Sequence, residues 1–197
     1  MFSRRHCLAL LALLLLGTNS CASSRTATPP ATVAFVDLAR YSGTWYELAR
    51  LPMWFQRDCL QSKAEYTLLP GKGMDVVNSC PAKEGGHKEA HGIATVVDEQ
   101  TNAKLTVLFD NWFSRLFPWL TRGDYWILAL DPEYQTAVVG TPDREFLWIL
   151  ARQPAIEATK FEKLVDRAQT LGFGTERLLI FNNQPMPDAS GHTGATP

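Results

Sequence analysis

The sequence predicts an all-β protein: an eight-stranded antiparallel up-and-down β-barrel with one C-terminal α-helix packed on its outside. Three observations lead to this prediction. Apolar and polar residues alternate in short runs between residues 44 and 152, turn residues separate these runs, and helical spacing of apolar residues appears only after residue 154. Strands with such short connections favour a closed barrel, because closure leaves no unpaired sheet edge.

The predicted strands come first along the chain, after FVDLARYSG, which has the pattern of a short helical turn. Turn residues join them, as in the stretch PGKG at 70–73, whereas the aromatic segment WFSRLFPWLTRG between the fifth and sixth strands is expected to be a loop. The predicted strands are residues 44–51, 61–69, 74–79, 91–98, 103–109, 124–131, 134–140 and 145–152.

A helix is predicted in IEATKFEKLVDRAQTLGFG, where apolar residues recur on one face. Pro154 precedes this segment and Gly172 ends it. Its apolar face predicts packing against the barrel wall and consists of Phe161, Leu164, Val165, Ala168 and Leu171. Residues 177–183, RLLIFNN, are expected to form a last strand beside the first one.

The N-terminus has the layout of an export signal. Residues 1–20 combine the basic start MFSRRH with an apolar run that is too short to span a membrane, and they predict a signal peptide. Cys21 lies in TNSCASS, which resembles a bacterial lipobox and predicts Cys21 as the lipidated residue; ordinary cleavage near Ala22 is the alternative, because Thr18 departs from the lipobox pattern. Residues 21–34 are then a tether, 35–184 the barrel domain and 185–197 a disordered tail.

Composition and charge narrow the class of protein. The 197 residues are 46% hydrophobic, with a formal net charge of -1, so a globular chain is expected and a phosphate-tracking nucleic-acid binder is excluded. Outside the signal and Cys21, the cysteines are Cys59 and Cys80. In an exported protein they predict one disulfide; the alternative is a pair of buried free thiols.

The stretch YSGTWYELARLP at 41–52, together with GTPDREFLWILARQP at 140–154, resembles the lipocalin family, and most closely the bacterial outer-membrane lipoprotein lipocalins. The resemblance runs from about Phe35 to Pro185. It implies that Trp45, in the Gly43-Thr44-Trp45 motif, sits at the closed end of the barrel and that Arg152 packs over it. These three positions, Gly43, Trp45 and Arg152, are therefore expected to be structural.

Strand alternation then orients the other side chains. If Trp45 points inward, Glu47 and Ala49 point inward as well. On the sixth strand, the resemblance places Tyr125, Ile127 and Ala129 inside. On the eighth strand, the inward position of Arg152 implies that Leu150, Trp148 and Phe146 also point inward. Trp112 is expected near the open end with Phe113, Phe117 and Trp119, either at the entrance, on a membrane or packed on the rim. The predicted ligand-binding residues are Glu47, Ala49, Trp112, Tyr125, Ile127, Phe146 and Trp148. For Glu47, a structural hydrogen bond in the barrel is the favoured alternative to ligand contact.

The resemblance implies a binding protein rather than an enzyme. The expected function is to bind, store or transport fatty acids or lysophospholipids, tethered by lipid to the outer membrane of a bacterial cell and facing the periplasm. A lipocalin-fold enzyme or a carrier of another small hydrophobic ligand is the alternative, and the oligomeric state stays open between monomer and homodimer.

The chain carries little signal for a metal, a cofactor or catalysis. His87 and His91 are four residues apart in HKEAH, but the flanking glycines indicate a solvated strand or loop rather than a metal-binding helix. Alternation places no histidine inside the barrel, so haem is not expected, and no other cofactor, metal or catalytic residue is predicted.

Overall fold

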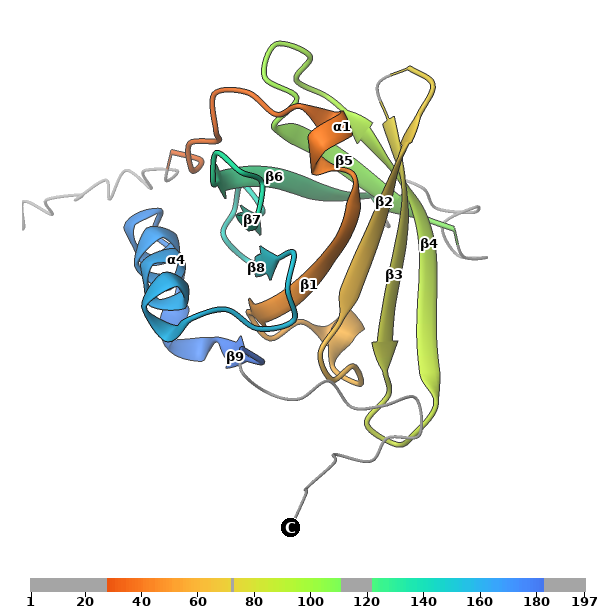
Figure 1. Ribbon diagram of the computed structural model, residues 1–197, viewed down its shortest axis with the longest axis vertical. Helices are drawn as coiled ribbons and strands as arrows, with labels where there is room; N and C mark the ends of the chain where they lie inside the picture. The colour runs from red at the N-terminus through yellow and green to blue at the C-terminus, as the bar shows by residue number, and fades with distance from the viewer. Residues whose placement is uncertain (1–27, 72, 111–121, 183–197) are drawn as a thin grey trace, which may run out of the picture.

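The structure, a computed structural model, describes residues 28–71, 73–110 and 122–182, and these contain nine strands in one antiparallel sheet (Figure 1). The strands follow the order β2-β3-β4-β5-β6-β7-β8-β1-β9, and β1 also pairs with β2. This second pairing closes the sheet, so the predicted eight-stranded barrel is confirmed, with β9 added beside β1. The strands are β1 Gly43–Arg50, β2 Lys63–Leu69, β3 Gly73–Pro81, β4 His87–Val96, β5 Lys104–Phe109, β6 Arg122–Leu130, β7 Thr136–Gly140, β8 Leu147–Ala151 and β9 Leu179–Ile180.

The helices lie outside this barrel or at its ends. They are α1 Leu38–Tyr41, the 3-10 helix η1 Trp54–Gln56, α4 Ala158–Thr170 and the 3-10 helix η2 Thr175–Arg177. Figure 1 shows α4 along the outer side of β7 and β8, which confirms the predicted helix and its position. Its Phe161 and Ala168 are buried against side chains of the wall. None of the helices that the structure describes is long and apolar enough to cross a membrane.

Two β-bulges interrupt the inside–outside alternation of the barrel. In β1, Glu47 pairs with Leu150 but Ala49 pairs with Ile149, so Leu48 is an extra residue. Leu48 and Ala49 both lie in the apolar cluster under α4, outside the barrel. The prediction that Ala49 points inward is therefore wrong, because strict alternation fails across a bulge.

The second bulge, in β6, has the same effect. Ile127 pairs with Val139 and Ala129 pairs with Val138, which leaves Leu128 as the extra residue. Leu128 and Ala129 both belong to the outer cluster beneath α4, whereas Ile127 belongs to the interior cluster. Ala129, expected inside, therefore also faces outward.

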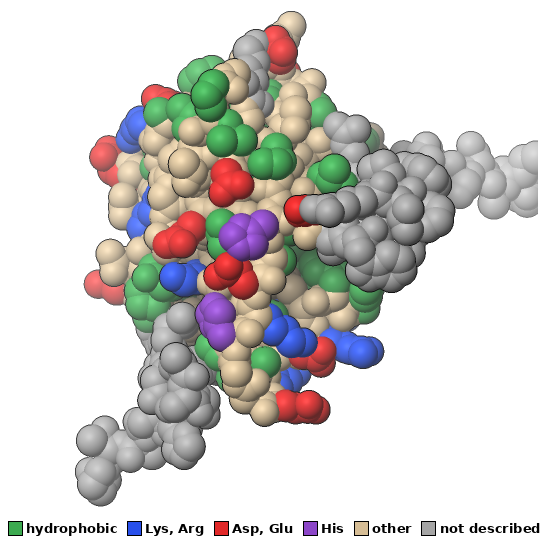
Figure 2. Space-filling model, turned by 90° about the vertical axis from the view of Figure 1, so that its right-hand side faces the viewer, with side chains coloured by type: hydrophobic (Ala, Val, Ile, Leu, Met, Phe, Trp, Pro, Cys, Tyr) green, Lys and Arg blue, Asp and Glu red, His purple; other side chains and the backbone are tan. Residues whose placement is uncertain are grey.

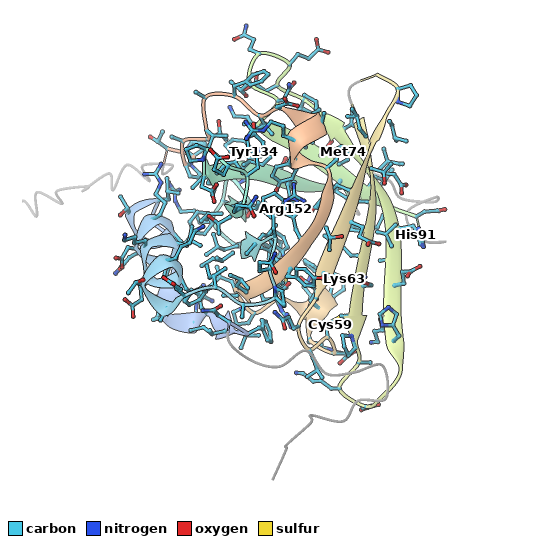
Figure 3. All side chains as sticks on the ribbon, viewed as in Figure 1. Cys59, Lys63, Met74, His91, Tyr134 and Arg152 are labelled. Carbon is cyan, nitrogen blue, oxygen red and sulfur yellow. A yellow bond between two sulfur atoms is a disulfide. The ribbon has the colours of Figure 1, made fainter. Side chains whose placement is uncertain are left out.

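The meander gives the barrel two different ends. The β2–β3, β4–β5 and β6–β7 turns lie with α1 at one end, the closed end; the β1–β2, β3–β4, β5–β6 and β7–β8 connections lie at the other end, called the mouth below. Figure 3 shows Tyr134 and Met74 toward the closed end and Cys59 toward the mouth.

Two segments differ from the sequence-based expectation. Residues 28–34, expected in the tether, lie along the wall: the Val33 amide donates to the Ile127 carbonyl at 3.0 Å, and Arg144 donates to the Thr28 carbonyl at 2.8 Å. The last strand is limited to Leu179–Ile180, because η2 occupies the preceding residues.

Candidate functional site

The closed end is covered by an indole and a guanidinium group. The guanidinium carbon of Arg152 lies 4.0 Å from the centroid of the Trp45 ring, which is the contact that the resemblance implies. Arg152 also donates to the carbonyls of Thr44 at 2.9 Å, Arg40 at 2.8 Å and Tyr41 at 3.0 Å. These bonds fix the planar fork of the side chain over the ring, which excludes water from this end of the interior.

Gly43 leaves the space that this arrangement needs. Its φ is +98°, a conformation that residues with a Cβ rarely adopt, and a Cβ at this position would lie 3.2 Å from Arg152 Nη1. Gly43 therefore belongs with Trp45 and Arg152, as the motif implies.

Three tyrosine hydroxyls meet inside the barrel next to this plug. The Tyr125 hydroxyl oxygen lies 2.7 Å from that of Tyr41, and Tyr66 donates to it at 2.9 Å. Burial raises the pKa of Tyr66 to about 12 and those of Tyr41 and Tyr125 well above the ordinary value of 10. The three groups are thus neutral at physiological pH, and they act as hydrogen-bonding groups rather than as bases.

Most of the predicted ligand-binding residues face the interior. Tyr125 and Ile127 belong to the interior cluster, with Trp148 packed against it. Phe146 lies at the mouth, and the centroid of its ring is 6.3 Å from that of Trp148. Trp112 lies outside the described residues. Together with the neighbouring strands, these side chains give the barrel an apolar and aromatic lining.

The mouth holds a polar network around Glu47 and Arg50, two buried residues of β1. Arg50 forms an ion pair with Glu47 and donates to the carbonyls of Gln56 and Leu60 at 3.1 Å and of Cys59 at 2.9 Å. Arg50 therefore holds the β1–β2 loop from beneath. Sequence reasoning missed this residue, because strict alternation would have pointed it outward; the bulge at Leu48 turns it inward.

Gln56 connects this network to the interior. Its side-chain amide donates to Glu47 at 3.2 Å and to Ser62 at 3.1 Å, and its oxygen accepts from the Trp148 indole at 3.0 Å. Burial raises the pKa of the Glu47 carboxyl, and Arg50 and Gln56 partly offset that effect. Glu47 is thus held in hydrogen bonds of the protein, which is the structural role that was the alternative to ligand contact.

Three buried side-chain atoms of the described residues have no hydrogen-bond partner, namely Arg50 Nε, Gln61 Oε1 and Asn78 Oδ1, and Asn78 lies on the β3 wall away from the Glu47 and Arg50 network. Asn78 follows Met74 and Val76 at alternate positions of β3, so its side chain faces inward. Its Oδ1 is buried and has no hydrogen-bond partner among the described residues. A buried amide oxygen of this kind favours a hydrogen-bond donor that comes from outside the protein.

The mouth is also crosslinked. Cys59 and Cys80 form a disulfide with a Cα–Cα distance of 5.6 Å, which confirms the predicted pair and corrects the alternative of two free thiols. The bond joins the β1–β2 loop to the end of β3. It leaves neither Cys59 nor Cys80 as a free thiol.

The outer wall near β4 is polar. Figure 2 shows histidine side chains there among acidic and basic groups, and Figure 3 shows His91 pointing away from the barrel. His91 Nε2 lies 2.7 Å from Glu89 Oε1, and the described residues contain no group of three or more side chains that could hold a metal ion. A groove of about 370 Å³ follows the same wall, lined by Asp75, His91, Gly92, Ile93, Leu108, Phe109 and Asp110.

Comparisons with known proteins agree with this geometry. The lipocalin-like domain family matches residues 36–183. An outer membrane lipoprotein Blc from Vibrio cholerae is 35% identical over 168 residues, covering 84% of this chain and 92% of its own. Temperature-induced lipocalin-1 from Arabidopsis thaliana is 33% identical over 165 residues, covering 82% and 86%.

A solved structure shares the fold. Insecticyanin from the tobacco hornworm Manduca sexta superimposes with a TM-score of 0.62 at 18% identity, covering 85% of this chain and 88% of that one. This likeness supports the architecture alone.

Proposed function

Because the chain belongs to the lipocalin family, we propose that it is a membrane-anchored lipocalin that binds, stores or transports fatty acids or lysophospholipids in the bacterial cell envelope. The observation that carries the proposal is the apolar and aromatic lining of the barrel, closed by Trp45 and Arg152 at one end. A site of this type suits an acyl chain, which needs apolar walls and few polar contacts.

The polar groups of the interior support a ligand with one polar end. Tyr125 and Tyr66 are neutral and already bonded to each other, and Glu47 is paired with Arg50. Asn78 Oδ1 has no partner among the residues described, so it can accept a hydrogen bond from a hydroxyl or a protonated carboxyl group of the ligand.

The envelope location rests on two supports. Relatives that match over most of the chain are named outer membrane lipoproteins. Cys21, in its lipobox-like context, supplies a residue that an acyl anchor requires. We place the protein on the periplasmic side of the outer membrane, as a monomer or homodimer.

The test is a ligand titration of the exported chain, delipidated under mild denaturation and refolded. Trp148 lies at the interior, so its fluorescence should change when a fatty acid or lysophospholipid binds. We expect saturable binding at micromolar or lower concentration. Isothermal titration calorimetry, which does not need the Trp148 signal, should show weaker binding in Trp148→Arg and retained binding in the control Trp126→Phe. No saturable response to either lipid would overturn the proposal and favour another hydrophobic ligand.

A further inference from the structure

The β1–β2 loop carries an exposed aromatic pair at the mouth. Trp54 is 77% exposed and Phe55 is 48% exposed, both on η1. Phe55 rests on the barrel, since its ring centroid lies 5.3 Å from that of Phe146, while the Trp54 ring stands edge-on to Phe55 at 5.6 Å. The indole thus projects beyond a ring that the barrel supports.

This exposure is built into the loop. Arg50 bonds three carbonyls of residues 56–60, and the disulfide of Cys59 ties the same loop to β3. Gln56, the residue after Phe55, also bonds the Trp148 indole. A loop held by so many bonds keeps its aromatic side chains outward, where an apolar contact with another body can bury them without reorganisation.

More apolar surface lies at the same end of β1. Strand β9 pairs with Ala49 and Arg50, and its Leu179 and Ile180 are 41% and 49% exposed. Figure 1 shows β9 at the end of β1 from which the loop to β2 departs. The exposed side chains Trp54, Phe55, Leu179 and Ile180 are called the apolar rim below.

The chain enters the described structure at this same end. Arg144, in the β7–β8 turn, donates to the Thr28 carbonyl at 2.8 Å. Arg144 is two residues before Phe146, whose ring contacts Phe55. Six residues lie between Cys21 and Thr28, so seven Cα–Cα steps join the two positions and span at most about 25 Å when fully extended. An acyl group on Cys21 would therefore keep the mouth close to the bilayer.

We propose that the apolar rim docks on the lipid bilayer that holds the acyl anchor, so that the mouth of the barrel faces the membrane surface. Lipid fits better than a protein partner, because an indole with an apolar body and one N–H group is suited to the membrane interface, and the short connection to Cys21 brings that interface to the rim. This proposal rests on the anchor in the proposed function. It adds that ligand enters directly from the membrane.

The test uses the exported, acylated chain reconstituted into phosphatidylethanolamine–phosphatidylglycerol vesicles whose acyl chains carry bromine, which quenches nearby tryptophan fluorescence. We expect Trp54→Phe to lower the quenched fraction, because it removes a tryptophan in contact with lipid. The control Trp126→Phe should raise that fraction. Trp126 lies in the middle of β6 beneath the Lys104 ammonium, 4.7 Å away, so its loss removes unquenched emission.

An unchanged or higher quenched fraction in Trp54→Phe would overturn the docking proposal. Unbrominated fatty acid at saturating concentration separates this outcome from failure of the proposed function, because it displaces lipid that quenches Trp148 inside the barrel. If the fatty acid relieves none of the quenching, the result counts against ligand binding in the barrel. If no quenching remains in the presence of the fatty acid, or if the remaining quenching is the same in Trp54→Phe, the result counts against docking.

Discussion

Replacing Arg50 by methionine tests whether the buried ion pair holds the mouth together. Arg50 is 1% exposed and Glu47 is 2% exposed, so Arg50→Met leaves a buried carboxylate without its cation and three loop carbonyls without their donor. Breaking one side of a buried pair costs about 3–5 kcal/mol, and methionine recovers part of the packing but none of the bonds. We expect a loss of about 3–4 kcal/mol in the free energy of unfolding near neutral pH.

The loss of stability in Arg50→Met should depend on pH in a definite direction. Burial already raises the pKa of Glu47, and removal of Arg50 raises it further. A carboxyl whose pKa is higher in the folded protein binds its proton more tightly there. Its stabilising contribution is therefore complete below the unfolded pKa and is lost as pH rises through the folded pKa. The deficit of Arg50→Met should be smaller in acid than at neutral pH.

The assay is urea unfolding of the disulfide-bonded chain at several pH values. The matched control combines Arg50→Met with Glu47→Gln, which removes both charges. At neutral pH this double variant should be more stable than Arg50→Met alone. Its loss of stability relative to wild type should not grow between acid and neutral pH as that of Arg50→Met does, because no carboxyl group titrates at position 47. The reasoning is refuted if Arg50→Met lies within about 1 kcal/mol of wild type, or if the double variant is no more stable than the single one.

Two further predictions concern the closed half of the barrel. Arg152→Lys keeps a cation near Trp45 but loses the planar fork that bonds several carbonyls, so we expect a loss of about 2–3 kcal/mol in the free energy of unfolding, measured by urea denaturation; equal stability would contradict this role. The pKa of Tyr66 is raised to about 12 by burial, so Tyr66 should contribute a fall of about 2–3 kcal/mol in stability as pH rises from about 10 through about 12, in addition to any fall from Tyr41 and Tyr125. Unfolding measured against pH should show this fall in wild type, and an equal fall in Tyr66→Phe would contradict the assignment.

Much of the barrel follows from the sequence, because its signals are local. Alternating strands, short turns and one apolar helical face specify the meander and the position of α4. The paired motifs around Trp45 and Arg152 also specify the plug, since each side chain needs only its own strand and one partner. The two cysteines left in the exported domain specified their own pairing.

The inward-facing residues were less predictable, because side-chain direction depends on register between strands. A bulge reverses the side to which each later side chain of the strand points. No local sequence pattern indicates that Leu48 or Leu128 is the extra residue. The tyrosine cluster was missed in part for a related reason. Tyr41 belongs to α1 and Tyr66 to β2, and only closure of the barrel brings their hydroxyls to Tyr125.

The bulge in β1 joins two features that look unrelated in the sequence. Leu48 and Ala49 turn outward together and pack under α4, and the Leu48 carbonyl accepts hydrogen bonds from Phe181 and Asn182 beyond β9. The same extra residue returns Arg50 to the inside, where it binds Glu47 and the loop at the mouth.

The bulge therefore underlies two features: the packing of the C-terminal segment on the outer wall, and the fixed conformation of the β1–β2 loop at the mouth. A side chain that follows the bulge cannot serve both faces, so the position of Arg50 depends on Leu48 and Ala49 remaining buried beneath Phe161 of α4. The aromatic side chains at the mouth are positioned by Arg50 in turn. The outer helix therefore also stabilises the β1–β2 loop at the mouth, where we propose that lipid enters the barrel.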